Sequence, residues 1–201
     1  MNYQKDENKL NTKDLITIGI FTALFFVFQL IGAFPLMMNP ATMFFMPFGI
    51  ALLCGPIILL LLARVAKRGS LIIVGIVNSI IWFVTGMHWG MVVGYALMGI
   101  IADFVAGIKD YKSIKLNILA YALFCLGPTG SFVVYFIDPS AWAATMLHNG
   151  TSMEIIKGIN EMAASWVLPV ILIGTLLIAA VSGIIGKKLL KKQFKKAGMI
   201  Q

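Results

Sequence analysis

The lysines and arginines of this chain gather in four clusters that lie between long apolar segments. The chain has 16 Lys and Arg residues, and only Lys157 lies outside the clusters. The clusters occupy residues 5–13, 64–68, 109–115 and 187–196. They fall at every second gap between apolar segments, and basic residues beside membrane-spanning helices are retained on the cytoplasmic side. The pattern predicts a multi-pass membrane protein with both termini inside.

The composition agrees with a membrane location. Of the 201 residues, 60% are hydrophobic and 12% are charged, whereas soluble domains average about a quarter charged residues. The apolar segments approach about 20 residues, the length of helix that crosses roughly 30 Å of hydrocarbon. The net charge of +8 lies beside these segments, so attraction to anionic lipid explains it better than nucleic-acid binding does.

We expect an all-α membrane protein with one domain, residues 1–201, that forms a six-helix bundle. The spans are expected at about 15–34, 42–63, 71–87, 89–108, 116–137 and 164–186. The two halves show no sequence repeat, which disfavours a transporter built from inverted repeats. The outer connection 138–163 is much longer than the others, and connections of this length often form functional lids.

The outer connection carries the signals of two short helices. A turn at Asp138 precedes Ser140, which can cap a first helix. Thr151 and Glu154 have the spacing of a capping box, which predicts a second helix. We therefore expect a structured lid over the outer side of the bundle.

Aromatic and imidazole side chains gather on the outer side of this topology. Both histidines and all four tryptophans map there, namely His88, His148, Trp82, Trp89, Trp142 and Trp166. Any single Trp could belong to the belt of aromatic residues that lies at a membrane–water interface. Such a belt normally occurs at both interfaces, however, and no Trp maps to the inner one. The one-sided set indicates an aromatic pocket open to the outside, of the kind that holds flat polar molecules by stacking.

The candidate substrate-binding residues combine these aromatic groups with polar groups of the outer loops. They are Asn39, His88, Trp89, Tyr135, Trp142, His148, Asn160, Glu161 and Trp166. Glu161 lies four residues after Lys157, so an ion pair on one helix face is an equal alternative to a ligand contact. His148 has an alternative role as the end of a helix.

Two polar residues stand out within the apolar segments, where polar groups are costly and often functional. Asn78 lies near the middle of its span and can bridge helices by hydrogen bonding. For Asp103 we favour a structural role, with Lys109 or another inner basic residue as partner.

No catalytic or nucleotide-binding motif is present in the sequence. It contains no Walker A sequence, no G-x-S-x-G, no H-E-x-x-H and no paired carboxylates on one helix face. Cys54 and Cys125 fall in apolar segments without metal-ligand spacing, so we expect two buried apolar groups. The chain is predicted not to be an enzyme, to hold no cofactor or metal, and to take any energy for transport from partners.

Small residues at four-residue spacing occur in the first and last apolar segments. Gly19 and Ala23 form such a step in the first segment. In the last segment the small residues are Ala179, Ser182, Gly183 and Gly186. Helix faces made of small residues let two helices approach closely in lipid, and the second helix can belong to the same bundle or to another membrane protein.

The chain resembles the substrate-binding S components of energy-coupling factor (ECF) transporters. It is most similar to the MptE/Trep_Strep group, through Lys13–Leu24, Cys54-Gly55-Pro56-Ile57 and Gly99–Asp103. The resemblance covers nearly the whole chain. It implies a protein of the bacterial cytoplasmic membrane that captures a vitamin or vitamin precursor on its outer side.

The resemblance also implies partners. The first helix of an S component docks through small residues on a transmembrane T component, and Gly19 and Ala23 match that position. Two ATPase subunits then drive the cycle, and the S component topples in the membrane to release its substrate inside.

The outer residues favour a flat nitrogen heterocycle as substrate, with hydroxymethylpyrimidine, pyridoxine and thiamine as candidates. Lys157 is the only basic residue outside, which argues against folate, pantothenate or another carboxylate-bearing vitamin. The alternative function is a stand-alone secondary carrier or channel for a small polar solute.

Overall fold

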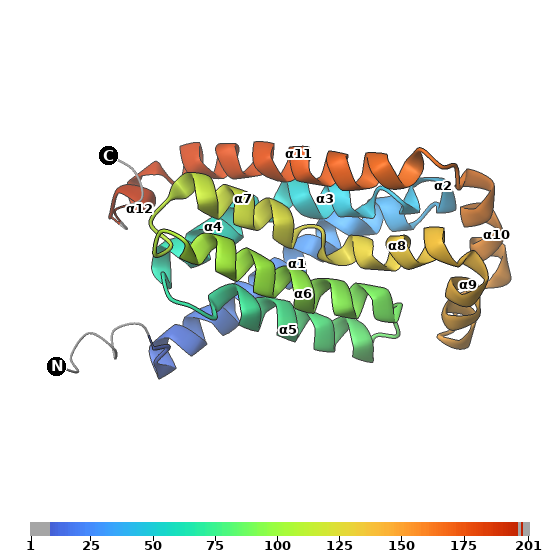
Figure 1. Ribbon diagram of the computed structural model, residues 1–201, viewed down its shortest axis with the longest axis horizontal. Coiled ribbons are helices and arrows are strands. Elements are labelled where there is room, and N and C mark those ends of the chain that lie inside the picture. The colour runs from blue at the N-terminus through green and yellow to red at the C-terminus, as the bar shows by residue number, and fades with distance from the viewer. Residues whose placement is uncertain (1–8, 197, 199–201) are drawn as a thin grey trace.

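The computed structural model describes residues 9–196 and residue 198. Helices make up its secondary structure, and no strand occurs among the described residues (Figure 1). The elements are α1 (Thr12–Met37), α2 (Pro40–Met43), α3 (Met46–Leu53), α4 (Gly55–Arg64), α5 (Ser70–Val84), α6 (Trp89–Gly107), α7 (Ile114–Phe124), the 3-10 turn η1 (Gly127–Thr129), α8 (Gly130–Ile137), α9 (Pro139–His148), α10 (Met153–Met162), α11 (Val167–Leu189) and α12 (Lys191–Lys196). The predicted all-α class is confirmed.

Four helical segments are long and apolar enough to cross a membrane. They are α1, α6, the combined segment Ile114–Ile137 and α11. The pair α3 and α4, bent by 46°, adds a fifth if it is counted as one span. Helix α5 has 15 residues, which extend about 22 Å and fall short of roughly 30 Å of hydrocarbon. Each predicted span thus has a helical counterpart, and α5 is the short one.

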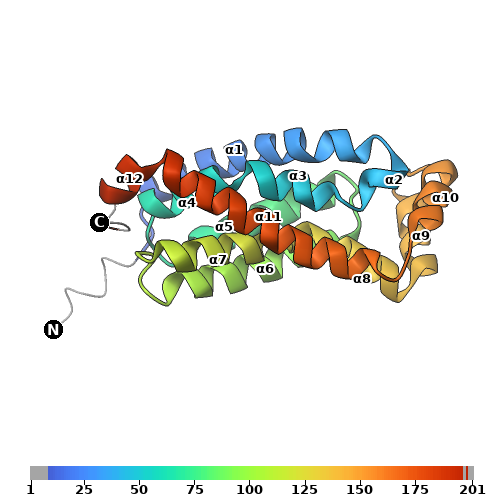
Figure 2. The same cartoon turned by 90° about the horizontal axis from the view of Figure 1, so that it is seen from above.

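The long helices lie side by side along the longest axis of the molecule (Figures 1 and 2). Helix α5 packs along α6, α1 packs along α3, and α11 contacts α3, α4 and α7. This arrangement places segments from both halves of the chain in one bundle.

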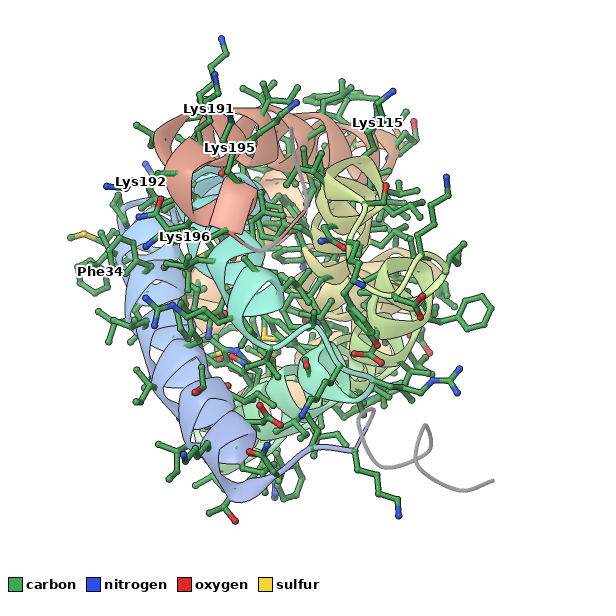
Figure 3. All side chains as sticks on the ribbon, turned by 90° about the vertical axis from the view of Figure 1, so that its left-hand side faces the viewer. Phe34, Lys115, Lys191, Lys192, Lys195 and Lys196 are labelled. Atoms are coloured by element: carbon green, nitrogen blue, oxygen red, sulfur yellow. The ribbon has the colours of Figure 1, made fainter. Side chains whose placement is uncertain are left out.

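The two ends of the bundle differ in charge. The start of α1, the end of α4, the α6–α7 connection and α12 share one end, which we call the basic end (Figure 1). Figure 3 looks onto this end, where Lys115 and the lysines of α12 are labelled. Helices α2, α9 and α10 share the opposite end, which we call the lid end. The described parts of the four basic clusters therefore gather at one end, as their alternation in the sequence predicts, and Lys5 lies outside the described residues.

Helix α1 begins at a capping box next to an ion pair. The Asn11 side chain accepts the Asp14 N–H at 3.0 Å, and the Asp14 carboxylate accepts the Asn11 N–H at 2.9 Å. Asp14 also pairs with Lys67 at 2.8 Å. The pair fixes the start of α1 to the α4–α5 connection.

Helix breaks interrupt two of the predicted spans. Cys54 separates α3 from α4, with Pro56 in the first turn of α4. Pro128 lies in η1, between α7 and α8. Proline lacks an N–H and clashes with the carbonyl four residues earlier, so it begins a helix more readily than it continues one. Both segments were predicted as continuous spans, and the proline positions explain the difference.

Glycine allows the closest helix approaches in the bundle. A Cβ at Gly75 of α5 would lie 2.6 Å from the Tyr95 carbonyl oxygen and 3.0 Å from the Cα of Gly99, both in α6. Gly32 of α1 likewise meets the backbone of Gly49 in α3. Larger residues at these positions would push the helix axes apart.

A buried chain of polar side chains joins three helices in the bundle. The Tyr95 hydroxyl donates to Gln29 Oε1 at 2.7 Å, and Gln29 Nε2 donates to Asn78 Oδ1 at 2.8 Å. Asn78 Nδ2 in turn donates to the Val74 carbonyl at 2.8 Å. The chain ties α1 to α5 and α6, which confirms the predicted bridging role of Asn78.

Asp103 has a structural role, but its partners are not basic residues. Its carboxylate accepts the Gly69 N–H at 2.9 Å, the Leu71 N–H at 3.0 Å and the Tyr111 hydroxyl at 2.9 Å. Asp103 of α6 therefore caps the start of α5, where free N–H groups favour an anion. The predicted contact with Lys109 is wrong, because two backbone N–H groups and the Tyr111 hydroxyl occupy the carboxylate.

We expect Asp103→Ala to lower the free energy of unfolding by about 3 kcal/mol, because three donors, two of them in buried hydrogen bonds, lose their acceptor. The matched variant Asp103→Asn keeps one acceptor oxygen and should lose less. Thermal unfolding of the purified protein in detergent measures both changes. Equal stability of the Ala variant and the wild-type protein would contradict the capping role.

Candidate functional site

An aromatic cluster lies at the lid end, where four parts of the chain meet. Its members come from the α2–α3 connection, the α5–α6 turn, α8 and α9, and they are Phe44, His88, Phe132, Tyr135, Phe136 and Trp142. The Tyr135 ring meets the Trp142 ring edge to face, with centroids 5.2 Å apart. The Phe44 ring lies 5.3 to 5.6 Å from the rings of α8. Edge-to-face contacts of this kind stabilise a fixed aromatic arrangement.

His88 lies in this cluster and caps α6. Its Nδ1 accepts the Gly90 N–H at 3.0 Å, which satisfies one of the free donors at the helix start. The side chain is only 1% exposed, and burial lowers the pKa of its imidazole. The ring is therefore neutral near pH 7.

Two tryptophan rings flank His88. The Trp142 ring stacks on the imidazole at 28°, with centroids 6.0 Å apart, and the Trp89 ring lies 5.2 Å away. Trp142 is buried, and its Nε1 donates to Ser131 Oγ at 3.0 Å. Trp89 is 52% exposed. His88 thus sits between an inner and an outer indole.

The lid is folded, as the sequence predicts, and hydrogen bonds tie it to the bundle. Trp142 ties α9 to α8 through Ser131. The Tyr135 hydroxyl of α8 donates to Asn160 Oδ1 of α10 at 2.7 Å, and Asn149 Nδ2 donates to the Gly86 carbonyl at 2.8 Å. Helix α10 also packs on α2.

The capping residues of the lid differ from the predicted ones. Asp138, not Ser140, caps α9 by accepting the Ala141 N–H at 2.9 Å. Ser152 caps α10, so Thr151 and Glu154 do not form a capping box. Both corrections arise because adjacent polar side chains compete for the same free N–H groups.

The predicted pairing of Lys157 with Glu161 is also wrong. No ion pair joins them in the described part of the chain, and both side chains are exposed on α10. An ion pair between two exposed side chains adds little stability, because each charge is already well hydrated when the two are apart.

The structure brings together some of the predicted binding residues and separates others. His88, Trp89, Tyr135, Trp142 and Asn160 lie in or beside the aromatic cluster. Those that do not join it are Asn39, His148, Glu161 and Trp166. Their binding roles remain predictions.

Each of these four residues has a definite position. Asn39 caps α2 by accepting the Ala41 N–H at 2.9 Å. His148 is the last residue of α9 and is exposed, as is Glu161 on α10. Trp166 precedes α11 and is 58% exposed, a position typical of an interfacial belt.

Sequence reasoning missed several residues of this region. Phe44, Phe132 and Ser131 complete the cluster and its hydrogen bonds, but in the sequence they resemble ordinary apolar and small residues of a span. Gln29 carried a signal, because it is an amide within the first apolar segment and intramembrane polar groups stand out.

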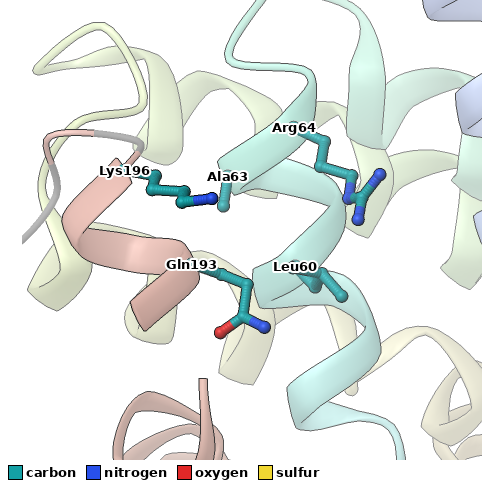
Figure 4. Close-up of a pocket in the computed structure, with 5 residues that line it drawn as sticks. All are labelled: Leu60, Ala63, Arg64, Gln193 and Lys196. Carbon is teal, nitrogen blue, oxygen red and sulfur yellow. The ribbon is translucent and has the colours of Figure 1, made fainter. Parts of the chain in front are cut away.

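Two of the hollows outside the aromatic cluster differ in their lining. One, of about 280 Å³, is apolar and lies between α6, α8 and α11, with Trp89 and Leu172 among its lining residues. The other, of about 220 Å³, lies at the basic end beside Arg64, Gln193 and Lys196 (Figure 4). Its charge suits the attraction to anionic lipid expected of a basic end. The described residues contain no cluster of potential metal ligands.

The two small-residue faces differ in their surroundings. Gly19 and Ala23 are exposed on α1, and a Cβ at Gly19 would meet no atom within 4 Å. The small face of α11 is buried instead. A Cβ at Gly55 of α4 would contact Ser182, and one at Gly186 would lie 3.1 Å from Pro56. The α11 face therefore serves packing within the bundle, whereas the α1 face is open.

A family model described as "hypothetical bacterial integral membrane protein (Trep_Strep)" matches residues 12–196. No match was found to a curated protein or to a solved structure.

The lowered pKa of His88 predicts a loss of stability in acid. The unfolded chain takes up a proton on this imidazole near pH 6.5, whereas burial in the folded protein lowers the pKa of His88 below that value. The free energy of unfolding should therefore fall as the pH drops below about 6.5. His88→Asn keeps a capping oxygen and does not titrate, so thermal unfolding of this variant should depend less on pH. Parallel pH profiles for the two proteins would contradict the prediction.

Proposed function

This chain belongs to the Trep_Strep family of bacterial integral membrane proteins, and we propose that it is the substrate-capturing S component of an ECF-type importer. The observation that carries the proposal is the open small-residue face of α1. Gly19 and Ala23 are exposed while the equivalent residues of α11 are buried. A small face left open on a lipid-facing helix suits close docking of another membrane helix.

The partner proposed for this face is a transmembrane T component, joined to two ATPase subunits that supply energy. Ile16 and Ile20 flank the small residues and are also exposed, so the surface is apolar and fits a partner within the membrane. The sequence itself carries no nucleotide-binding motif, which makes an external energy source necessary for active uptake.

The proposed topology has six spans, with α5 as the third and both termini in the cytoplasm. The gathering of the basic clusters at one end supports this orientation, because Lys and Arg are retained inside. The lid end then faces outward. Helix α5 is shorter than the other proposed spans. Because it packs along α6, one of its sides faces protein and not lipid, which is compatible with a short span.

The proposed capture site is the aromatic cluster under the lid. Buried rings from α8 and α9 offer stacking surfaces, and His88 and Asn160 offer polar groups beside them. Such a combination suits a flat heterocycle of a water-soluble vitamin or precursor. The lid helices must move for a ligand to reach the rings, because Trp142 and Tyr135 are buried.

We expect Gly19→Leu and Ala23→Leu to abolish co-purification with the T component and ATPases, because the added side chains keep the partner helix away. The folded protein should remain intact, since the position at Gly19 is open. Affinity purification from cells that express all subunits measures the loss.

Val181→Phe provides the matched control, because Val181 is exposed on α11 and the change adds bulk to a lipid-facing helix elsewhere. It should leave assembly unchanged. Wild-type assembly of the Gly19→Leu variant would overturn the docking assignment. Uptake by the isolated protein in liposomes, driven by an ion gradient, would favour a secondary carrier instead.

Cysteine labelling tests the orientation with little background, because Cys54 and Cys125 are buried. Ala144 on the lid and Lys192 on α12 are both exposed. A membrane-impermeant maleimide added to intact cells should label Ala144→Cys and leave Lys192→Cys unlabelled until the membrane is opened. The reverse pattern would refute the proposed topology.

A further inference from the structure

The capping bond of His88 determines which ring nitrogen carries the proton. Nδ1 accepts the Gly90 N–H at 3.0 Å, so this nitrogen uses its lone pair as the acceptor and bears no hydrogen. A neutral imidazole has one N–H. That N–H is therefore on Nε2, which makes Nε2 a hydrogen-bond donor.

The Nε2 donor is buried without a partner among the described residues. Leaving a buried donor unpaired costs free energy, and an unpaired buried polar group in a folded protein therefore needs an explanation. Trp82 Nε1 and Thr175 Oγ1 are also unpaired, but they lie on α5 and α11 outside the aromatic cluster. His88 is the unpaired donor within it.

The two other aromatic polar groups of the cluster, the Tyr135 hydroxyl and Trp142 Nε1, already have acceptors. The Tyr135 hydroxyl donates to Asn160, and Trp142 Nε1 donates to Ser131. A ligand that stacks on the rings would therefore meet the His88 Nε2–H, a buried donor that is fixed in position and has no partner among the described residues. The cap holds the imidazole in place, and the Trp89 and Trp142 rings flank it.

We propose that the His88 Nε2–H donates a hydrogen bond to a neutral acceptor, a ring nitrogen or carbonyl oxygen, on a flat heterocyclic ligand stacked in the aromatic cluster. This inference rests on the proposed capture function. Burial keeps the imidazole uncharged and lowers its pKa, so it offers no cation to an anionic ligand. A carboxylate buried here would stay unpaired at high cost.

The variants His88→Asn and His88→Gln separate the donor from the cap. Asparagine retains a side-chain oxygen for the Gly90 N–H but has no group that reaches the position of Nε2. Glutamine extends an amide N–H about as far as Nε2 and should recover part of the binding. A merely structural His88 would give the opposite order, with Asn the better substitute.

Two probes test the acceptor. One is hydroxymethylpyrimidine, and the other is its benzene analogue, in which CH replaces both ring nitrogens. Calorimetric titration of the purified protein in detergent should show the pyrimidine binding the wild-type protein at least about tenfold more tightly, equivalent to about 1.4 kcal/mol. His88→Asn should remove this preference and leave binding of the benzene analogue unchanged.

Equal pyrimidine affinity in the wild-type protein and His88→Asn would overturn the proposal. Failure of both probes to bind the wild-type protein would overturn the ligand class that it states. Neither result bears on the S-component assignment, because assembly of the Gly19→Leu variant with the T component and ATPases is measured without ligand. Thermal unfolding of each variant shows whether a loss of binding reflects a loss of fold.

Discussion

Hydrogen bonding of the few polar groups inside an apolar bundle is the constraint on which this structure depends. An unpaired polar group in hydrocarbon costs several kcal/mol, so these groups restrict how the helices can pack. Asp103 closes the start of α5, and Gln29 joins Tyr95 to Asn78. Together they hold α1, α5 and α6 in one register. The hydrogen-bonded helices α5 and α6 in turn position the turn between them, which carries His88.

The long helices and the charge difference between the ends could be predicted, because apolar length and basic flanks are local properties of the sequence. The breaks at Cys54 and Pro128 were missed, since a proline in an apolar run is also compatible with a kinked continuous span. Helix α12 was missed for another reason. It is six residues of mostly lysine, and the burial of Phe194 holds it against the bundle.

For the candidate site, the sequence indicated the correct side of the molecule but not the partners. Trp142 and Trp166 had equal signals, yet one is buried against Tyr135 and the other is exposed beside α11. Which indole turns inward depends on the fold of the lid, and this is a tertiary property. The same holds for the small residues. Spacing alone does not distinguish Gly19, which is open, from Gly183, which packs against Ile118.

The contact of α10 with α2 differs from the other attachments of the lid. Helix α9 is held to α8 and to the α5–α6 turn by side-chain hydrogen bonds, and α10 is held to α8 by Asn160. Among the described residues, no side-chain hydrogen bond joins α10 to α2. Gly158 of α10 packs instead against the ring of Pro40 in α2. A seam closed only by van der Waals contact separates without leaving polar groups unpaired. Separation of α10 from α2 would therefore break no side-chain hydrogen bond between them, and the bonds that attach the rest of the lid would not be affected.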